Sequence, residues 1–243
     1  MLGLEDRPDV SNRFLRALPE ATLERIWPGL ERVELLRGQV VGRMNQHVGH
    51  VYFVNRGLIS LVKTMLDGRT IEIGAVGIEG VTDPYALCGI DAVMLETIVQ
   101  VAGTAFRIRI DTLRDAVRHD DAFVDLTHRY IRFCYHQLAQ TAACNRLHSL
   151  EERCCRWLLI AHDSALSDTF PLTHEFLAMM LGAQRGGVTI AANALKKAGL
   201  IHYTHGMVTV TNRSGLEEAA CECHRSIEHE LHAVFGRDLM RKR

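Results

Sequence analysis

The chain has 243 residues, of which 47% are hydrophobic, and a formal net charge of -1 at pH 7. This length favours two domains, and the balanced charge argues against a polycation that wraps nucleic acid without specificity. No apolar run approaches the roughly eighteen residues of a membrane span. The first residues lack the features of a signal peptide, so we expect a cytoplasmic protein with no membrane partner.

Residues 1–110 are predicted to form a β-domain. Within them, short apolar runs such as 51–54 and 57–62 alternate with glycines. Asp67-Gly68 lies between two later runs and is typical of a hairpin turn. Many short strands separated by regular turns indicate a sandwich or a barrel.

The segment 77–97 belongs to this domain and contains no arginine or lysine. A buried phosphate without a cation would be poorly compensated, so the segment does not predict a phosphate site. We interpret Glu79 and Asp83 as part of a solvated loop, and the alternative is that they bind another ligand. No effector can be assigned from these residues.

Residues 111–147 are predicted to be a dimerisation helix and hinge. The apolar pattern repeats every seven residues, which is typical of a seam between two helices. The candidate dimer-interface residues are Val124, Ile131, Cys134, Leu138, Thr141 and Asn145. The alternative is an amphipathic helix that packs on its own β-domain through Phe123, Leu126, Tyr130 and Phe133.

A third region, residues 148–243, begins after a hinge expected at 145–149. Ser149 and Glu152 have the spacing of a capping box, which predicts that a new helix begins there. Farther on, residues 172–201 are predicted to form two short helices around a turn at Gly182, the layout of a helix-turn-helix.

The second of these helices, 184–197, has an apolar side made of Val188, Ala191 and Leu195. Its opposite side carries three cations and no carboxylate, which suits a phosphate-lined groove in double-stranded DNA. The candidate DNA-binding residues are Thr173, which is also the predicted N-cap of the first helix, Gln184, Arg185, Gly186, Thr189, Ile190, Asn193, Lys196 and Lys197.

Two adjacent glycines, Gly186 and Gly187, begin the second helix, although each costs up to about 1 kcal/mol relative to alanine. One interpretation is that they allow backbone amides to approach a phosphate closely. The other is that a fraying helix end tolerates them.

After this helix, residues 201–204 and 207–210 are predicted to form a hairpin wing that turns at His205-Gly206. Ser214 and Glu217 have the spacing of a second capping box, so we expect a helix from there to about residue 235. A basic tail, 237–243, follows. The tail region is expected to pack on the DNA-binding domain, to extend a dimer contact or to contact phosphates, and the sequence leaves all three open.

Seven cysteines in such a chain predict free thiols and no disulfide framework. Neighbours such as Cys154-Cys155, or Cys221 and Cys223, do not share one face of a helix. Neither pair makes a metal site alone, and we therefore predict no metal and no cofactor.

The segment from Gly182 to Val188, continued through residues 199–201, resembles the recognition helix of the CRP/FNR family of bacterial transcription regulators. The resemblance implies that Arg185 reads a guanine edge. Gly186 and Ile190 stand where members of the family have a glutamate and a second arginine that read bases. We therefore expect a different operator.

The same resemblance implies an α+β protein with an N-terminal β-jelly-roll sensor domain, a dimerisation helix and a C-terminal winged helix-turn-helix. It further implies a homodimer on a palindromic operator, with RNA polymerase as a partner if the protein is an activator. Family members that bind cyclic nucleotides use a glutamate for the ribose and an arginine for the phosphate. Because residues 77–97 supply no cation, we predict that cyclic AMP does not regulate this protein.

Two other classes of function fit the sequence less well than a DNA-binding regulator. An enzyme is not favoured, because the chain has no nucleophile elbow, P-loop, HExxH or dinucleotide glycine motif, and we predict no catalytic residues. The alternative is a regulatory or scaffold protein with a cyclic-nucleotide-type β-domain and no DNA activity. The cationic side of residues 184–197 argues against it.

Overall fold

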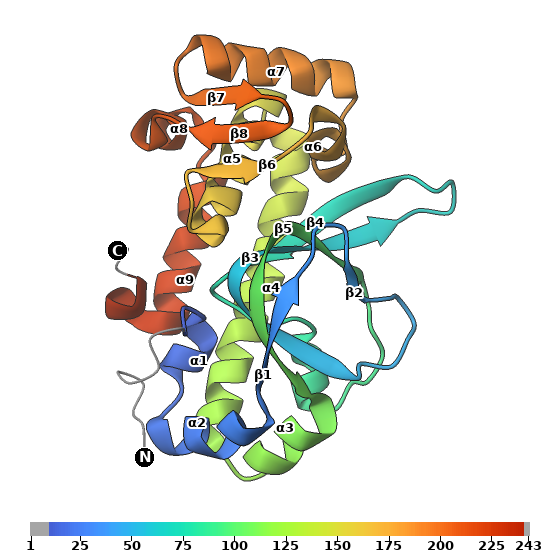
Figure 1. Ribbon diagram of the computed structural model, residues 1–243, viewed down its shortest axis with the longest axis vertical. Coiled ribbons are helices and arrows are strands. Elements are labelled where there is room, and N and C mark those ends of the chain that lie inside the picture. The colour runs from blue at the N-terminus through green and yellow to red at the C-terminus, as the bar shows by residue number, and fades with distance from the viewer. Residues whose placement is uncertain (1–9, 241–243) are drawn as a thin grey trace.

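The computed structural model describes residues 10–240, with side chains described as far as Gly236. A β-domain and a helix-turn-helix domain lie at opposite ends of a long central helix (Figure 1). This order of parts agrees with the predicted α+β fold class. No helix within the described part combines the length and apolar character that a membrane span requires.

The β-domain is built on one antiparallel sheet whose strand order is β1-β5-β3-β4, with β2 also paired to β5. The strands are β1 (Glu31–Leu35), β2 (Val40–Gly42), β3 (His50–Thr64), β4 (Thr70–Val76) and β5 (Glu96–Arg109). The hairpin between β3 and β4 turns at Gly68, whose φ of 82° lies in the left-handed region that glycine adopts without strain. The predicted turn at Asp67-Gly68 is therefore present.

Within the described residues, three short helices precede this sheet: α1 (Arg13–Ala17), α2 (Glu20–Ile26) and the 3-10 helix η2 (Trp27–Gly29). The Phe14 ring of α1 lies 5.8 Å from Phe123 and 5.6 Å from Tyr130, measured between ring centroids. The N-terminal helices thus share a core with the central helix, and the sequence analysis did not identify them.

The helix predicted over residues 111–146 is in fact two helices, α3 (Ile110–Val117) and α4 (Asp121–Leu147). The carboxylate of Asp120 begins α4, because it accepts a hydrogen bond from the Phe123 amide at 2.9 Å. Asp120 also accepts a bond from Thr22 Oγ1 at 2.5 Å and forms an ion pair with Arg25. These contacts with α2 fix the break between the two helices.

The C-terminal region also differs from the prediction, since it forms α8 (Arg213–Ala219) and α9 (Cys223–Met240) in place of one helix. Asn212 caps α8 by accepting a hydrogen bond from the Gly215 amide at 3.0 Å, so the capping box predicted at Ser214 is wrong. Ala220 then ends α8 in an extended conformation, and the chain turns before α9.

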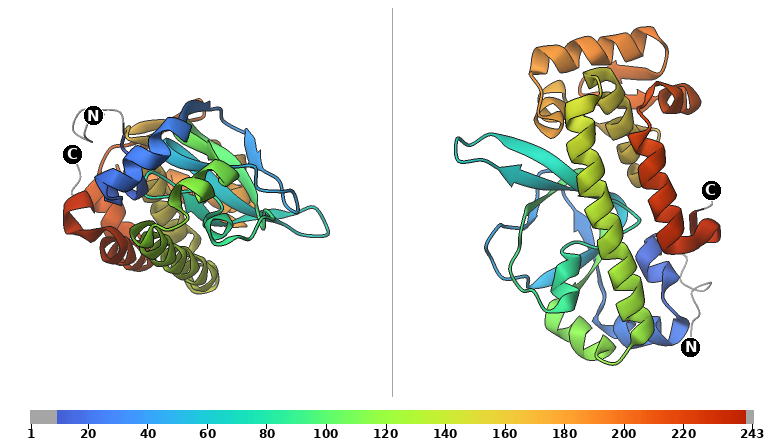
Figure 2. Two further views of the ribbon diagram at one scale, coloured as in Figure 1. Left: turned by 90° about the horizontal axis from the view of Figure 1, so that it is seen from below. Right: turned by 180° about the vertical axis from the view of Figure 1, so that it is seen from behind.

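Helix α9 packs along α4 of the same chain (Figures 1 and 2). Glu230 forms an ion pair with Arg132 at 2.8 Å, and Ser226 Oγ lies 3.1 Å from His136 Nε2. Arg129 Nη1 donates to the carbonyl of Val234 at 2.7 Å. The C-terminal helix therefore covers one side of the central helix, whereas the side chains of the predicted basic tail lie outside the described residues.

The helix-turn-helix domain docks on the sheet through α5 (Leu150–Ala165). One apolar core joins residues of β3, β4 and β5 to residues of α5 and the helices beyond it, among them Leu58, Val62, Ala75, Val101, Leu158 and Leu177. Glu72 of β4 is buried in this interface and accepts hydrogen bonds from Trp157 Nε1, at 3.1 Å, and from Ser60 Oγ. Burial raises the pKa of Glu72 to about 7.

This carboxyl should make stability depend on pH. Its folded pKa of about 7 exceeds the unfolded value of 4.5, so its contribution is complete below the unfolded pKa and is lost as pH rises through 7. Between about pH 6 and pH 8, we expect the free energy of unfolding of the parent to fall by about 1 kcal/mol relative to Glu72→Gln. Denaturant titration at several pH values measures this difference. Glu34→Gln, at an exposed site, is the control, and an equal pH dependence in Glu72→Gln and the parent would contradict the expectation.

Candidate nucleic-acid interface

The C-terminal domain has the order of a winged helix-turn-helix. Its elements are β6 (Thr169–Pro171), α6 (His174–Leu181), α7 (Arg185–Lys197), β7 (Ile201–Thr204) and β8 (Met207–Val210). The three strands form one antiparallel sheet in the order β6-β8-β7. Helix α7 lies along the end of the molecule that is opposite α2 and α3 (Figure 1).

Local hydrogen bonds set the two helices. Thr173 caps α6 by accepting from the Phe176 amide at 3.2 Å, as predicted. Gly182 ends α6 with φ 57°, and a Cβ atom there would lie 2.5 Å from Ile71 Cδ1 of β4. The turn therefore requires glycine both for its left-handed backbone and for its close contact with the β-domain.

Helix α7 divides into a buried and an exposed side as the sequence pattern predicts. Its buried residues are Val188, Ala191, Ala192 and Leu195. The exposed candidates for DNA contact are Gln184, Arg185, Gly186, Ile190, Asn193, Lys196 and Lys197, and Thr173 is exposed at the start of α6. Ile190 is 70% exposed, so one large apolar side chain lies among the polar candidates.

Thr189 differs from the other candidates because it is half-buried and already engaged. Its hydroxyl donates to the Arg185 carbonyl at 3.0 Å and lies 3.0 Å from His174 Nδ1. The His174 ring stacks on Tyr203 of the wing, with 4.5 Å between ring centroids. Thr189 thus helps to join α6, α7 and β7, which leaves it less available for a base.

His174 is a member of this interface that the sequence analysis missed. Burial and the nearby charge of Arg185 lower its pKa. Because the Thr189 hydroxyl donates to a carbonyl, it accepts from His174 Nδ1–H. The sequence places His174 in the first turn of α6, directly after the N-cap Thr173, but it does not indicate the contacts with Thr189 and Tyr203.

The first turn of α7 presents its backbone to solvent. Gln184 precedes it without a capping hydrogen bond from its side chain, and no acidic residue lies in that turn. A Cβ added to Gly186 would meet nothing within 4 Å, whereas one on Gly187 would lie 3.1 Å from Leu150 Cδ2 of α5. The two glycines therefore have different surroundings, and only Gly186 faces open space.

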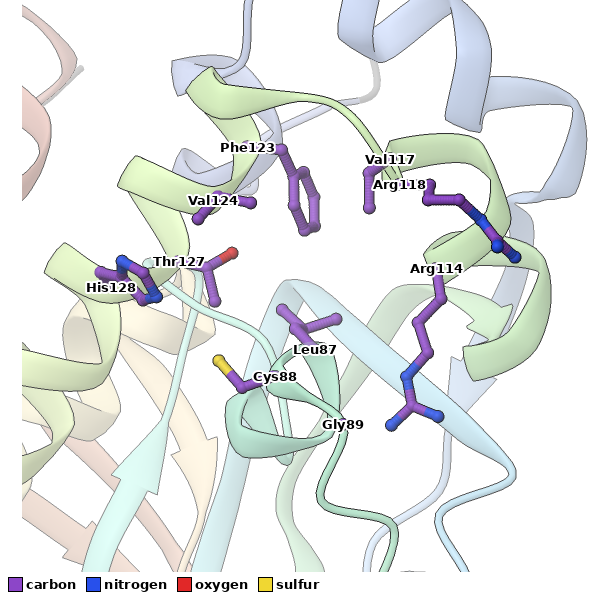
Figure 3. Close-up of a pocket in the computed structure, with 10 residues that line it drawn as sticks. All are labelled: Leu87, Cys88, Gly89, Arg114, Val117, Arg118, Phe123, Val124, Thr127 and His128. Carbon is purple, nitrogen blue, oxygen red and sulfur yellow. The ribbon is translucent and has the colours of Figure 1, made fainter.

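The β-domain contains a cavity of about 450 Å³ between the 3-10 helix η3 (Pro84–Cys88), α3 and α4 (Figure 3). Leu87 and Phe123 point into it, and Arg114 stands at its side (Figure 3). Arg114 Nε donates to the carbonyl of Ala86 at 2.9 Å, and its guanidinium forms an ion pair with Asp91. The cation that residues 77–97 lack is therefore supplied by α3, but it is used to hold this segment in place.

Glu79 and Asp83 do not lie in a solvated loop, so that interpretation was wrong. Both are buried, at 9% and 7% exposure. Glu79 accepts from the Gly77 amide at 2.8 Å, and Asp83 accepts from the Tyr85 hydroxyl at 2.5 Å. Burial raises the pKa of both carboxyls. Their hydrogen bonds show a structural role in shaping the segment.

The exposed side of α7, the turn at Gly182 and the wing together define a winged helix-turn-helix domain of the DNA-binding type. Comparisons with known proteins give the same class. Residues 152–219 match the family model of the Crp-like helix-turn-helix domain. A search of curated proteins found no match.

Several solved structures of transcription regulators have a similar fold. A putative transcriptional regulator of the CRP/FNR family from Eubacterium rectale is 17% identical, with a TM-score of 0.63 over 84% of this chain and 95% of the other. FixK2 from Bradyrhizobium japonicum is 14% identical, with a TM-score of 0.65 over 79% of this chain and 98% of the other. The c-di-GMP responsive regulator CLP from Xanthomonas campestris is 17% identical, with a TM-score of 0.57 over 79% and 99%. Residues 152–219 are thus a Crp-like helix-turn-helix domain, and the fold of the chain is similar to that of these CRP/FNR regulators.

Substitution of Gly186 and Gly187 distinguishes two interpretations: that the backbone approaches a phosphate closely, and that a helix end tolerates glycine. Gly186→Ala should raise the free energy of unfolding by about 0.5–1 kcal/mol, because alanine favours the helix and meets no neighbour. If backbone amides approach a phosphate there, the same change should weaken DNA binding several-fold. Denaturant titration and gel shifts measure the two effects. Gly187→Ala is the matched comparison, with a smaller gain in stability because its methyl group presses on Leu150. Unchanged DNA affinity in Gly186→Ala would leave simple tolerance as the explanation.

Proposed function

We propose that this regulator binds a palindromic operator as a homodimer and that cyclic AMP does not control it. The observation that carries the proposal is the exposed side of α7, which presents Arg185, Lys196 and Lys197 without a carboxylate. Such a surface suits the phosphates and base edges of a major groove. Genome-wide mapping of the bound sites tests it, because the motif reports palindrome, half-site spacing and base preference together.

The dimer surface that we propose is the open side of α4. Val124 and Tyr135 are exposed there, Tyr135 at 75%, and Ile131 and Leu138 are half-buried. These residues follow one another at intervals of three, four and seven, which keeps them on one side of the helix. Arg129, Arg132 and His136, which contact α9, lie on a different side. Asn145, also half-buried, continues the open side toward the DNA-binding domain.

Two residues of the sequence-based seam belong to the interior of the chain. Thr141 is buried at 6% exposure, and Cys134 packs against the core that contains Tyr130. His128 and Ala142, both exposed, occupy the corresponding places between the heptad positions on the open side. The interface that we propose therefore includes His128 and Ala142 and leaves out Cys134 and Thr141.

Base readout is proposed to differ from that of other family members. Gly186 offers no side chain, and the exposed Ile190 is placed to contact a thymine methyl group. Gln184 and Asn193 supply the polar contacts in this proposal, while Thr189 serves the domain itself. Contact with RNA polymerase follows only if the protein activates transcription.

Independence from cyclic AMP is supported by the surroundings of residues 77–97. This segment has no cation of its own, and Arg114 is engaged by the Ala86 carbonyl and Asp91. A bound phosphate would have to compete with these partners. Calorimetry that detects micromolar binding of cyclic AMP or cyclic GMP would overturn this part of the proposal.

The second candidate function is a scaffold that does not bind DNA. It explains the β-domain, but it gives no reason for a solvent-facing side of α7 with three cations and Ile190. A gel shift with the promoter region of its own gene, repeated at several salt concentrations, separates the two. Binding without sequence preference at physiological salt favours the scaffold.

Substitutions on α7 should separate base reading from phosphate contact. Arg185→Ala is expected to cost about 1–3 kcal/mol on the cognate site and to relax one base position. Lys196→Ala and Lys197→Ala are expected to weaken binding to all sequences alike and to flatten its salt dependence. Fluorescence anisotropy with cognate and scrambled duplexes over a salt series measures both. Arg185 has no base-reading role if both affinity and specificity survive its removal.

A charge on the open side of α4 should dissociate the dimer. Ile131→Glu combined with Tyr135→Glu places like charges at the proposed seam of both subunits, and we expect a monomer with at least tenfold weaker operator binding. Ala122→Glu, on an exposed and different side of α4, is the control and should remain dimeric. Sedimentation velocity gives the oligomeric state. A double variant that stays dimeric would show that the interface lies elsewhere.

A further inference from the structure

Three cysteines and a histidine meet where α4 ends and α9 begins. The group, here called the hinge cluster, consists of Cys144, His148, Cys221 and Cys223, and its sulfur and ring-nitrogen atoms all lie within 4.8 Å of one another. Cys144 Sγ is 3.6 Å from Cys221 Sγ, and Cys223 Sγ is 3.4 Å from His148 Nδ1. We propose that the hinge cluster binds one zinc ion through three thiolates and one imidazole.

Two local arrangements bring these donors together. Cys144 lies in the last turn of α4, and His148 is the C-cap residue whose amide donates to the Cys144 carbonyl, so the two residues lie close together. Cys221 lies in the turn after α8, and Cys223 is the first residue of α9. Packing of α9 against α4 then places the two pairs opposite each other.

The spacing fits a single tetrahedral ion. Zinc–sulfur bonds of about 2.3 Å in a tetrahedron require sulfurs about 3.8 Å apart, with somewhat shorter sulfur–nitrogen edges. The sulfur–sulfur distance of 3.6 Å and the shorter sulfur–nitrogen distance of 3.4 Å are close to these values. A cluster with two or more irons needs cysteines on opposite sides of a larger group, so the hinge cluster is too compact for it.

Neighbouring polar side chains orient the four proposed ligands of the hinge cluster. Glu222 Oε2 lies 3.1 Å from His148 Nε2, an outer carboxylate contact that leaves Nδ1 directed at Cys223. Gln140 Nε2 donates to Cys223 Sγ at 3.0 Å.

Burial also favours a metal over a simple disulfide. Cys144, Cys221 and Cys223 are at most 4% exposed and form a small core of their own, apart from the larger apolar cores. A disulfide between Cys144 and Cys221 would not explain why Cys223 and His148 lie beside them. One zinc ion uses all four donors, and buried Arg156 offsets the negative charge that three thiolates bring.

The proposed ion would close the chain around the DNA-binding domain. The two pairs of ligands flank residues 149–220, and the Crp-like domain at 152–219 lies wholly between them. The metal would therefore fasten the exit of this domain to its entrance at the hinge. Loss of the ion should loosen the domain on α4, because metal binding and folding are coupled at such sites.

Metal content of the full chain tests the proposal. After purification under reducing conditions from medium that contains zinc, elemental analysis should find one zinc ion per chain in the parent and in Cys88→Ser, whose cysteine is exposed and outside the hinge cluster. Cys223→Ser should lose the metal. Chelation should lower the melting temperature of the parent by several degrees and that of Cys223→Ser little.

Cobalt(II) added to the metal-free chain supplies a second readout. We expect the thiolate charge-transfer and visible absorption bands of a tetrahedral site in the parent. His148→Cys should retain a metal and shift these bands, which keeps the test decisive even if Cys223→Ser does not fold. A folded parent that binds neither zinc nor cobalt would overturn the proposal. So would an iron–sulfur chromophore, or a Cys144–Cys221 disulfide found by mass spectrometry in the protein purified under reduction.

Discussion

Helix α4 presents three different sides along its length, and the arrangement of the other elements depends on what each side contacts. One side, with Phe123, Tyr130 and Phe133, completes the core of the β-domain and the N-terminal helices. A second side carries the polar groups that hold α9. Among the described residues the third side remains open, and it is the side that we propose as the contact with a second subunit. Because the helix is rigid, each surface fixes the direction of the other two.

The sequence identified the helix-turn-helix well because its signals are local. The cap at Thr173, the glycine at Gly182 and the apolar spacing from Val188 to Leu195 act within a few residues of one another. The exposed candidates on α7 followed from the same spacing. Thr189 was the exception, since its hydrogen bond to His174 crosses between two helices.

Features that depend on distant partners could not be predicted in this way. The break before α4 needs Thr22 and Arg25 to bind Asp120. The burial of Glu79 depends on packing that its own neighbours in sequence do not indicate. The hinge cluster joins positions more than seventy residues apart, so each cysteine pair is uninformative until α9 is placed on α4.

The two domains meet through a continuous core that also contains polar contacts. Arg153 bridges the end of α4 and the end of α6, because it donates to the Asn145 carbonyl at 3.2 Å and to the Leu181 carbonyl. Arg56 of β3 donates to the Ala165 carbonyl at the end of α5, at 3.0 Å. Such contacts orient the recognition helix relative to the sheet without a covalent link.

The contact between Gly182 and Ile71 has a mechanical consequence. Gly182 in the turn of the helix-turn-helix has no side chain, and Ile71 of β4 lies directly against its backbone. Close-packed interiors transmit displacement instead of absorbing it. A movement of the β3–β4 hairpin toward the turn would therefore press directly on the backbone that joins α6 to α7.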